Sequence, residues 1–117
     1  DGLDEISTMD ATDVLLVEED RIDALELSPA VLGVPTATLD DLAGGGPERN
    51  AQVLRAAIGG EPGPVRDILV VNAAAALWMA GIAHDMADGM ARAEQAATGG
   101  AAKDVLERFI DMTGRLS

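Results

Sequence analysis

Apolar residues in the first quarter of the chain fall into two short runs, and from residue 47 onward they recur at helical spacing. The two runs, residues 14–17 and 22–27, are rich in leucine and β-branched residues, and four polar residues separate them. Runs of this composition around a tight polar connection predict a β-hairpin. A hairpin alone is only marginally stable in water, so we expect its strands to join a sheet whose other strands lie outside this chain.

Four helices are predicted after a long loop. Ser28-Pro29 ends the hairpin because proline cannot donate to a continuing ladder, and the composition of residues 29–46 predicts mostly loop with one helical turn near 39–42. Pro47 suits the first position of a helix, and glycine pairs are placed to end two of the helices. The four helices are expected at 47–58, at about 65–80, at 85–98 and at 101–113.

The second of these helices is apolar on every side, which is typical of a helix buried in a protein core. It falls short of the roughly 20 apolar residues that span a bilayer. Asn72 interrupts the apolar run and is expected to satisfy a backbone group or to pin a neighbouring loop. His84 follows the helix and is expected to act as a cation or donor at its negative end.

Length and composition fit one folded segment, residues 1–117, rather than two domains. Of the 117 residues, 48% are hydrophobic, which is enough apolar material to form a core. The net charge of −13 argues against binding to nucleic acid or to an anionic membrane. The absence of cysteine excludes disulfides, thiolate metal sites and cysteine nucleophiles, and it fits a cytoplasmic protein. Because the chain begins with Asp1-Gly2-Leu3 and has no signal-peptide pattern, we expect it to be internal to a longer protein.

The acidic residues are concentrated at one end of the chain. Residues 1–45 hold twelve acidic residues and a single basic one, Arg21, and Lys103 is the only lysine. An acid-rich, lysine-poor surface is typical of proteins that work at high salt, where screening removes the self-repulsion. The alternative is an ordinary acidic protein encoded by a GC-rich genome.

Few residues could carry chemistry. The chain has one histidine and no tyrosine, and it has no phosphate-binding loop of the Walker or Rossmann kind. Glycines 44–46 precede a predicted helix and could admit an anion at its N-terminus. Without a preceding strand or a neighbouring lysine, a simple turn is the favoured interpretation.

Asp4 and Glu5 are the candidate metal ligands. Two adjacent carboxylates in a loop can both point outward and offer oxygen atoms to a hard cation, whereas on a regular strand they would face opposite sides. Mg²⁺ typically takes only one or two protein carboxylates, and phosphates of its substrate complete the shell. On spacing alone, solvated surface acids remain the alternative.

The first seven residues, Asp-Gly-Leu-Asp-Glu-Ile-Ser, resemble the G-L-D-E-[IL]-[ST] signature of the anthranilate phosphoribosyltransferase family. Further segments resemble the family in the same order and at approximately the same spacing, from residue 1 to about residue 83. These segments are 28–35 (Ser-Pro-Ala-Val-Leu-Gly-Val-Pro), 42–45 followed by Asn50-Ala51, 63–67 (Gly-Pro-Val-Arg-Asp), 72–77 (Asn-Ala-Ala-Ala-Ala-Leu) and Ala80-Gly81.

The resemblance implies an α/β fold class. It implies the C-terminal part of a phosphoribosyltransferase/nucleoside-phosphorylase-like catalytic domain, here one β-hairpin followed by about four helices. The family's N-terminal helical domain, through which it dimerises, and the upstream half of its α/β domain are absent from residues 1–117. So are the family's glycine-rich pyrophosphate loop, its K-H-G-N segment and the arginine that helps to place anthranilate.

The function implied by the resemblance is transfer of the 5-phosphoribosyl group from phosphoribosyl pyrophosphate to anthranilate, with release of pyrophosphate, in tryptophan biosynthesis. By position, Asp4 and Glu5 correspond to the family's Mg²⁺-binding carboxylates. The implied partners are the two substrates, the remainder of the same polypeptide and, in the full-length enzyme, a second copy in a homodimer. The chain alone is expected to be inactive, because it lacks a phosphate cradle.

Two alternatives remain open from the sequence. A fragment of a pyrimidine nucleoside phosphorylase would share the same general architecture, although the G-L-D-E context fits it less well. A non-catalytic acidic module that packs on a larger partner through the edge of the hairpin would also explain the composition.

Overall fold

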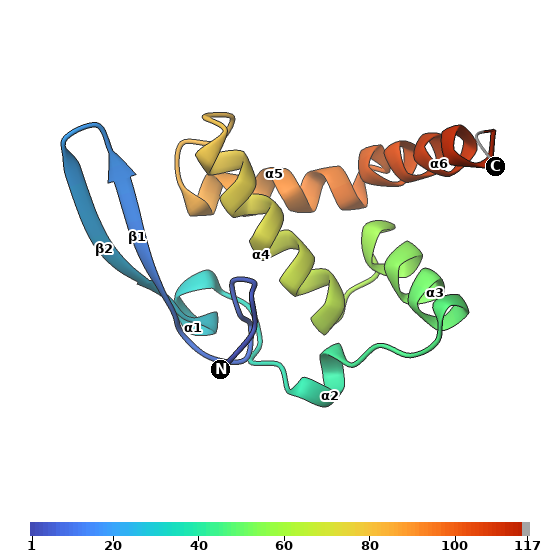
Figure 1. Ribbon diagram of the computed structural model, residues 1–117, viewed down its shortest axis with the longest axis horizontal. Helices are drawn as coiled ribbons and strands as arrows, with labels where there is room; N and C mark the ends of the chain where they lie inside the picture. Colours follow the sequence, from blue (N-terminus) through green and yellow to red (C-terminus); the bar gives the residue numbers. More distant parts are fainter. Residues whose placement is uncertain (116–117) are drawn as a thin grey trace.

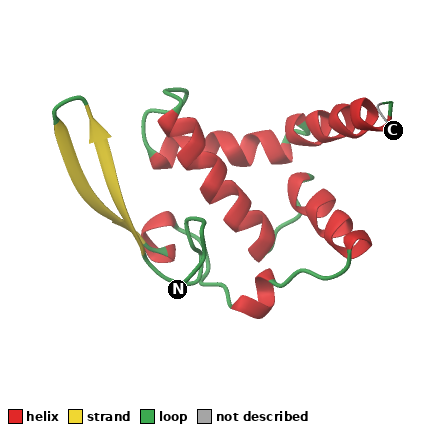
Figure 2. Ribbon diagram, viewed as in Figure 1, coloured by secondary structure: helices red, strands yellow, loops and turns green. Residues whose placement is uncertain are grey.

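The computed structural model describes residues 1–115, in which one β-hairpin is followed by six helices (Figures 1 and 2). The hairpin projects from one side of the molecule, and the helices form the rest (Figure 1). In chain order the elements are β1 (Thr12–Glu18), β2 (Arg21–Leu27), α1 (Pro29–Leu32), α2 (Leu39–Leu42), α3 (Pro47–Ile58), α4 (Pro64–Met79), α5 (Met86–Thr98) and α6 (Ala101–Gly114).

The predicted hairpin is confirmed. β1 and β2 pair antiparallel with Val14 opposite Leu25, and within residues 1–115 the sheet consists of these two strands. Glu19 begins the two-residue turn with a φ of 32°, a left-handed conformation that side chains other than glycine rarely adopt. On one face of the hairpin, Leu15, Val17 and Ile22 are each at least 66% exposed. This apolar face therefore has no cover within the described chain.

The four long helices are also confirmed, with boundaries within about two residues of those predicted. α3 begins at Pro47, and α5 begins after Asp85, whose carboxylate accepts a hydrogen bond from the backbone N–H of Asp88. The expected helical turn near 39–42 is α2, which is closed by a capping box between Thr38 and Asp41.

The short helix α1 lies in a segment that we predicted to be loop. The Ser28 side chain accepts a hydrogen bond from the N–H of Val31, and Pro29 occupies the first helical position. Gly33, at a φ of 72°, then ends the helix. A polar cap, a proline and a left-handed glycine are together enough for a single helical turn.

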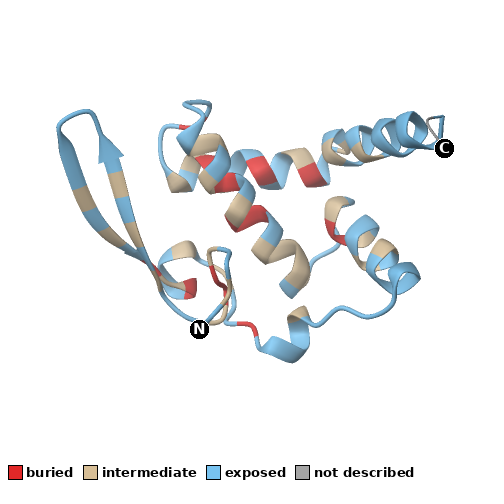
Figure 3. Ribbon diagram, viewed as in Figure 1, coloured by how far each residue is buried: buried red, intermediate tan, exposed pale blue. Residues whose placement is uncertain are grey.

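α4 lies at the centre of the helical part and packs most extensively against α5 (Figures 1 and 3). Val71 and Ala74 of α4 are fully buried, and so nearly are Ala93 and Ala97 of α5. The prediction of a core helix is therefore confirmed for this face of α4, while Met79 at its end is 60% exposed. Over residues 1–115, no helix has both the length and the apolar character needed to cross a membrane.

The expectation for His84 is wrong. α4 ends at Met79, and its last carbonyls accept hydrogen bonds from backbone N–H groups of the turn that follows. The N–H groups of Ile82 and Ala83, for example, both donate to the Leu77 carbonyl oxygen. His84 instead precedes α5, and its backbone N–H donates to the Asp88 carboxylate at 3.0 Å. The end of α4 is thus capped by backbone groups of the turn, and His84 lies just before α5 instead.

The molecule exposes more surface than a compact protein of its size. Its accessible surface is 7825 Å², whereas a compact chain of 12.0 kDa exposes about 6,000 Å². Its radius of gyration is 15.4 Å, against about 13 Å for a compact chain of this length. Figure 3 places much of the exposed surface on the hairpin and on α6, where Val105, Phe109 and Met112 are each at least 55% exposed.

Candidate functional site

Asp4 and Glu5 lie in the loop that leads into β1. Both residues are exposed and sit at a bend of the backbone, as expected for a pair of carboxylates that point outward together. Neither carboxylate has a hydrogen-bond or ion-pair partner among residues 1–115. The two side chains are therefore free to offer oxygen atoms to a cation or to remain solvated.

Asn72 holds this loop from the side of α4. Its Oδ1 accepts the N–H of Ile6 at 2.9 Å, and its Nδ2 donates to the Ile6 carbonyl at 3.0 Å. The same Nδ2 donates to the Ile68 carbonyl at 3.0 Å, one helical turn earlier. The prediction that Asn72 satisfies backbone groups or pins a neighbouring loop is confirmed, and the loop that it pins is the one that carries Asp4 and Glu5.

A second set of bonds closes the loop on its other side. The Asp1 carboxylate accepts the N–H of Leu3 at 3.0 Å and the hydroxyl of Ser7. The N–H of Ser7 donates in turn to the hydroxyl of Thr12, the first residue of β1, at 3.1 Å. Asp4 and Glu5 thus lie between an anchor at Asp1 and an anchor at Asn72.

The residues that follow the pair are buried. Ser7 is 1% exposed and Thr8 is fully buried, and the Thr8 carbonyl accepts the N–H of Ala37 at 2.9 Å. The Thr8 hydroxyl is one of two buried side-chain polar atoms among residues 1–115 that have no partner; the other is Arg66 Nε. The segment that follows Asp4 and Glu5 is therefore packed into the structure at Ser7 and Thr8, while the pair itself stays in solvent.

The donor set suits Mg²⁺ that is bound together with a phosphate ligand. Mg²⁺ is typically held by one or two carboxylates plus waters and substrate phosphates, rather than by a protein cage. Within residues 1–115, no group of three or more histidine, aspartate or glutamate side chains could hold a metal by itself. Two unpartnered carboxylates on an anchored loop fit the first arrangement.

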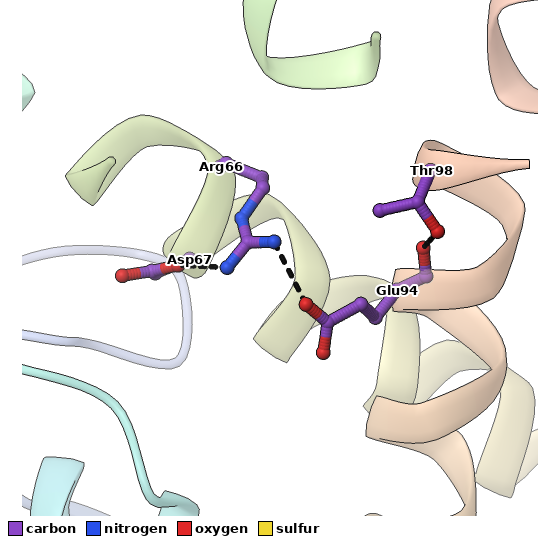
Figure 4. A network of polar contacts seen from close by, with 4 residues as sticks. All are labelled: Arg66, Asp67, Glu94 and Thr98. Carbon is purple, nitrogen blue, oxygen red and sulfur yellow. Dashed lines mark hydrogen bonds and ion pairs between the residues drawn. The ribbon is translucent and has the colours of Figure 1, made fainter. Parts of the chain in front are cut away.

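A polar network links α4 to α5 and was not singled out as a site from the sequence. Arg66 donates to Asp67 at 3.1 Å and to Glu94 at 2.8 Å (Figure 4), and its side chain is only 18% exposed. Burial lowers the pKa of Arg66, but hydrogen bonds and charges from both carboxylates outweigh it and raise the pKa above its ordinary value. The three side chains line a groove of about 700 Å³ between residues 32–37 and the two helices.

The glycine run before α3 is an irregular loop that bends at Gly46, where we predicted a simple turn. The side chain of Asn50 accepts the N–H of Gly45 at 2.7 Å and donates to its carbonyl at 3.1 Å. A Cβ at Gly44 would lie 2.9 Å from the Asn50 oxygen, so the loop packs tightly against the first turn of α3.

Comparisons with known proteins agree on one family. The protein-family model described as "Glycosyl transferase family, a/b domain" matches residues 1–103 of the sequence. The chain is 50% identical over 114 residues to an anthranilate phosphoribosyltransferase from Rhodospirillum rubrum, and covers 33% of that relative and 97% of itself. It is 46% identical over 110 residues to the corresponding enzyme from Methylorubrum extorquens, covering 33% of that relative and 94% of itself. The chain thus spans about a third of the length of these curated relatives.

Solved structures give the same result. The chain is similar to anthranilate phosphoribosyltransferase from Thermus thermophilus, with a TM-score of 0.70 and 36% identity over 75% of this chain and 27% of that one. It is also similar to the Saccharomyces cerevisiae enzyme in complex with phosphoribosyl pyrophosphate and Mg, with a TM-score of 0.80 and 28% identity over 94% of this chain and 32% of that one. The predicted α/β fold class and the family resemblance are confirmed, and the chain belongs to the glycosyl transferase family with this a/b domain.

Proposed function

We propose that this chain is the C-terminal part of the catalytic α/β domain of an anthranilate phosphoribosyltransferase, an enzyme of tryptophan biosynthesis. The complete protein would transfer the 5-phosphoribosyl group from phosphoribosyl pyrophosphate to anthranilate and release pyrophosphate. The observation that carries the proposal is the similarity of 94–97% of the chain to enzymes of this name. The exposed apolar face of the hairpin supports the view that the rest of the domain covers it.

Asp4 and Glu5 are proposed as the carboxylates that bind Mg²⁺. The pair lies in an anchored loop, and neither carboxylate has a protein partner among residues 1–115. A similar enzyme has also been solved in complex with phosphoribosyl pyrophosphate and Mg, which supports a metal site in this family. The adjacent anchors hold the backbone, so the side chains keep the freedom to adjust to a cation.

The chemistry assigns a clear task to this loop. Cleavage of the bond between ribose C1 and the pyrophosphate oxygen leaves its electron pair on pyrophosphate and positive charge on the ring. The anthranilate nitrogen then bonds to C1 and loses a proton. Mg²⁺, when bound, supplies Lewis-acid stabilisation of the leaving group. The carboxylates of Asp4 and Glu5 would hold that charge at a fixed place, which is the basis of electrostatic catalysis.

The activity test uses the complete polypeptide that carries this chain. Fluorescence of anthranilate should fall when the protein is mixed with phosphoribosyl pyrophosphate and Mg²⁺, whereas residues 1–117 alone should consume none. If the complete polypeptide instead cleaves pyrimidine nucleosides with phosphate, or has neither activity, the proposed function is wrong.

The site test compares two pairs of acidic residues. Asp4→Asn with Glu5→Gln should sharply raise the concentrations of Mg²⁺ and phosphoribosyl pyrophosphate that half-maximal rate requires. The matched control is Glu19→Gln with Asp20→Asn at the hairpin tip, an adjacent exposed pair whose replacement removes the same charge. Equal kinetics for both double variants and the wild type would reject the assignment of the metal ligands.

We also propose that the complete protein is a cytoplasmic homodimer and that its acidity is an adaptation to high salt. The composition supports the second point, since residues 1–45 carry most of the net charge of −13. Light scattering of the complete polypeptide tests the dimer, and unfolding at different KCl concentrations tests the salt adaptation.

A further inference from the structure

We propose that Asn72 is a positioning residue for the carboxylate pair, which sets the place of Asp4 and Glu5 through the backbone of Ile6. The inference rests on the proposed Mg²⁺ site and adds to it a residue of α4, 66 positions along the chain from the loop that it holds.

The geometry joins the amide directly to the residue that follows Glu5. Both backbone polar groups of Ile6 are bonded to the Asn72 amide, at 2.9 and 3.0 Å. Consecutive Cα atoms are about 3.8 Å apart, so a displacement of Ile6 is passed to Glu5 with little slack. On the other side, Asp1 bonds Leu3 and Ser7, which limits how far the loop can move to compensate.

The amide is itself fixed before it meets the loop. Its Nδ2 also donates to the carbonyl of Ile68 on the preceding turn of α4, so its orientation is set within the helix. Asn72 follows the fully buried Val71 in the helix that forms the centre of the core. The loop is therefore held by the helix that packs at the centre of the core, and ligands that must keep a cation in one place need such support.

Local preference alone does not account for an asparagine here. Asparagine is a poorer helix former than alanine, the residue that fills the next four positions of this helix. An apolar residue would satisfy the helix but would leave both backbone groups of Ile6 without these partners. The side chain thus serves the loop rather than the helix.

The experiment measures binding rather than turnover, in the complete polypeptide. Calorimetric titration with phosphoribosyl pyrophosphate at graded Mg²⁺ concentrations gives the free Mg²⁺ that half-saturation requires. Substitution of residues that orient metal ligands typically costs about 10–100-fold in metal affinity. We therefore expect Asn72→Ala to raise the required Mg²⁺ by a factor in that range.

Two further variants separate positioning from folding. Ala57→Gly in α3 removes a buried methyl group away from the loop, so it should lower thermal stability and leave the Mg²⁺ requirement unchanged. Asn72→Asp retains an acceptor for the Ile6 N–H but loses both Nδ2 bonds. Asn72→Asp should therefore raise the Mg²⁺ requirement as well. If Asn72→Ala does not fold, the Mg²⁺ requirement of Asn72→Asp tests the positioning role in its place.

The outcomes distinguish this inference from the proposed function. If Asn72→Ala or Asn72→Asp folds with a lower melting temperature but binds with the Mg²⁺ requirement of the wild type, the positioning role is wrong and the residue is only structural. If Asp4→Asn with Glu5→Gln also leaves Mg²⁺-dependent binding intact, the metal site itself is wrong. If the carboxylate double variant greatly raises the Mg²⁺ requirement and the Asn72 variants do not change it, the positioning role is wrong while the proposed metal site stands.

Discussion

Gly89 lies at the crossing of α4 and α5, where the two helix backbones touch. A Cβ added at Gly89 would lie 2.6 Å from the carbonyl oxygen of Ala74 and 3.0 Å from its Cα and its carbonyl carbon. Gly89 is buried and Ala74 is fully buried, so neither backbone can move without disturbing the core. Replacement of Gly89 by alanine should push the helices apart by several tenths of an ångström.

Two opposing effects decide the sign of this substitution. Alanine is favoured over glycine in a helix interior by about 1 kcal/mol. Overpacking of a well-packed core costs about 1–3 kcal/mol, and we take the upper end because the obstacle is backbone and no side-chain rotation relieves it. The expected result is a net loss of about 2 kcal/mol in the free energy of unfolding.

Urea unfolding followed by far-ultraviolet circular dichroism measures the loss. Gly114→Ala in α6 is the control, because a Cβ there would meet nothing within 4 Å, and the substitution should be neutral or slightly stabilising. Ala74→Gly should fail to rescue Gly89→Ala, since the clash is with backbone atoms. If Gly89→Ala is as stable as the wild type or more stable, the close approach of α4 and α5 is not what requires glycine.

Three further predictions concern charge. Arg66→Gln should lower the free energy of unfolding by about 1–3 kcal/mol, since it leaves partly buried polar groups without their partners. Arg92→Gln breaks an exposed pair and should cost at most about 1 kcal/mol. Equal losses for the two variants in urea unfolding would contradict this prediction. The Asp88 carboxylate accepts hydrogen bonds from Arg92 and from the His84 backbone, which hold its pKa below the ordinary value of 3.8. Its stabilising effect is therefore complete at neutral pH and is lost as the pH falls through the lowered pKa, so the stability difference between the wild type and Asp88→Asn should shrink in acid rather than stay constant. Finally, the free energy of unfolding at pH 7 should rise between dilute buffer and about 1 M KCl, and equal stability in both would reject the salt adaptation.

The hairpin and the long helices could be predicted because their signals are local. Apolar runs and their spacing mark the elements, and prolines or glycines mark most ends. A single turn such as α1 has no periodicity, so only its Ser28 cap and its proline could have indicated it. The position of His84 depended on where α4 stops, which is set by backbone hydrogen bonds in the turn beyond Met79.

Long-range partners could not be predicted from the sequence. Asn72 was expected to bond backbone, but its partner lies 66 residues away and became visible only when α4 was placed beside the loop. The pairing of Arg66 with Glu94 crosses 28 residues in the same way. Adjacency in a loop made Asp4 and Glu5 candidates, the family resemblance favoured them over surface acids, and the structure adds the anchors on either side of them.

The most direct test of the proposed site is the effect of Mg²⁺ on the affinity of the complete polypeptide for phosphoribosyl pyrophosphate. Calorimetry with and without Mg²⁺ should show a large gain in affinity for the wild type and for the Glu19→Gln with Asp20→Asn control. Asp4→Asn with Glu5→Gln should abolish most of that gain while leaving the Mg²⁺-free affinity nearly unchanged. An equal gain in all three proteins would show that Asp4 and Glu5 do not bind the metal.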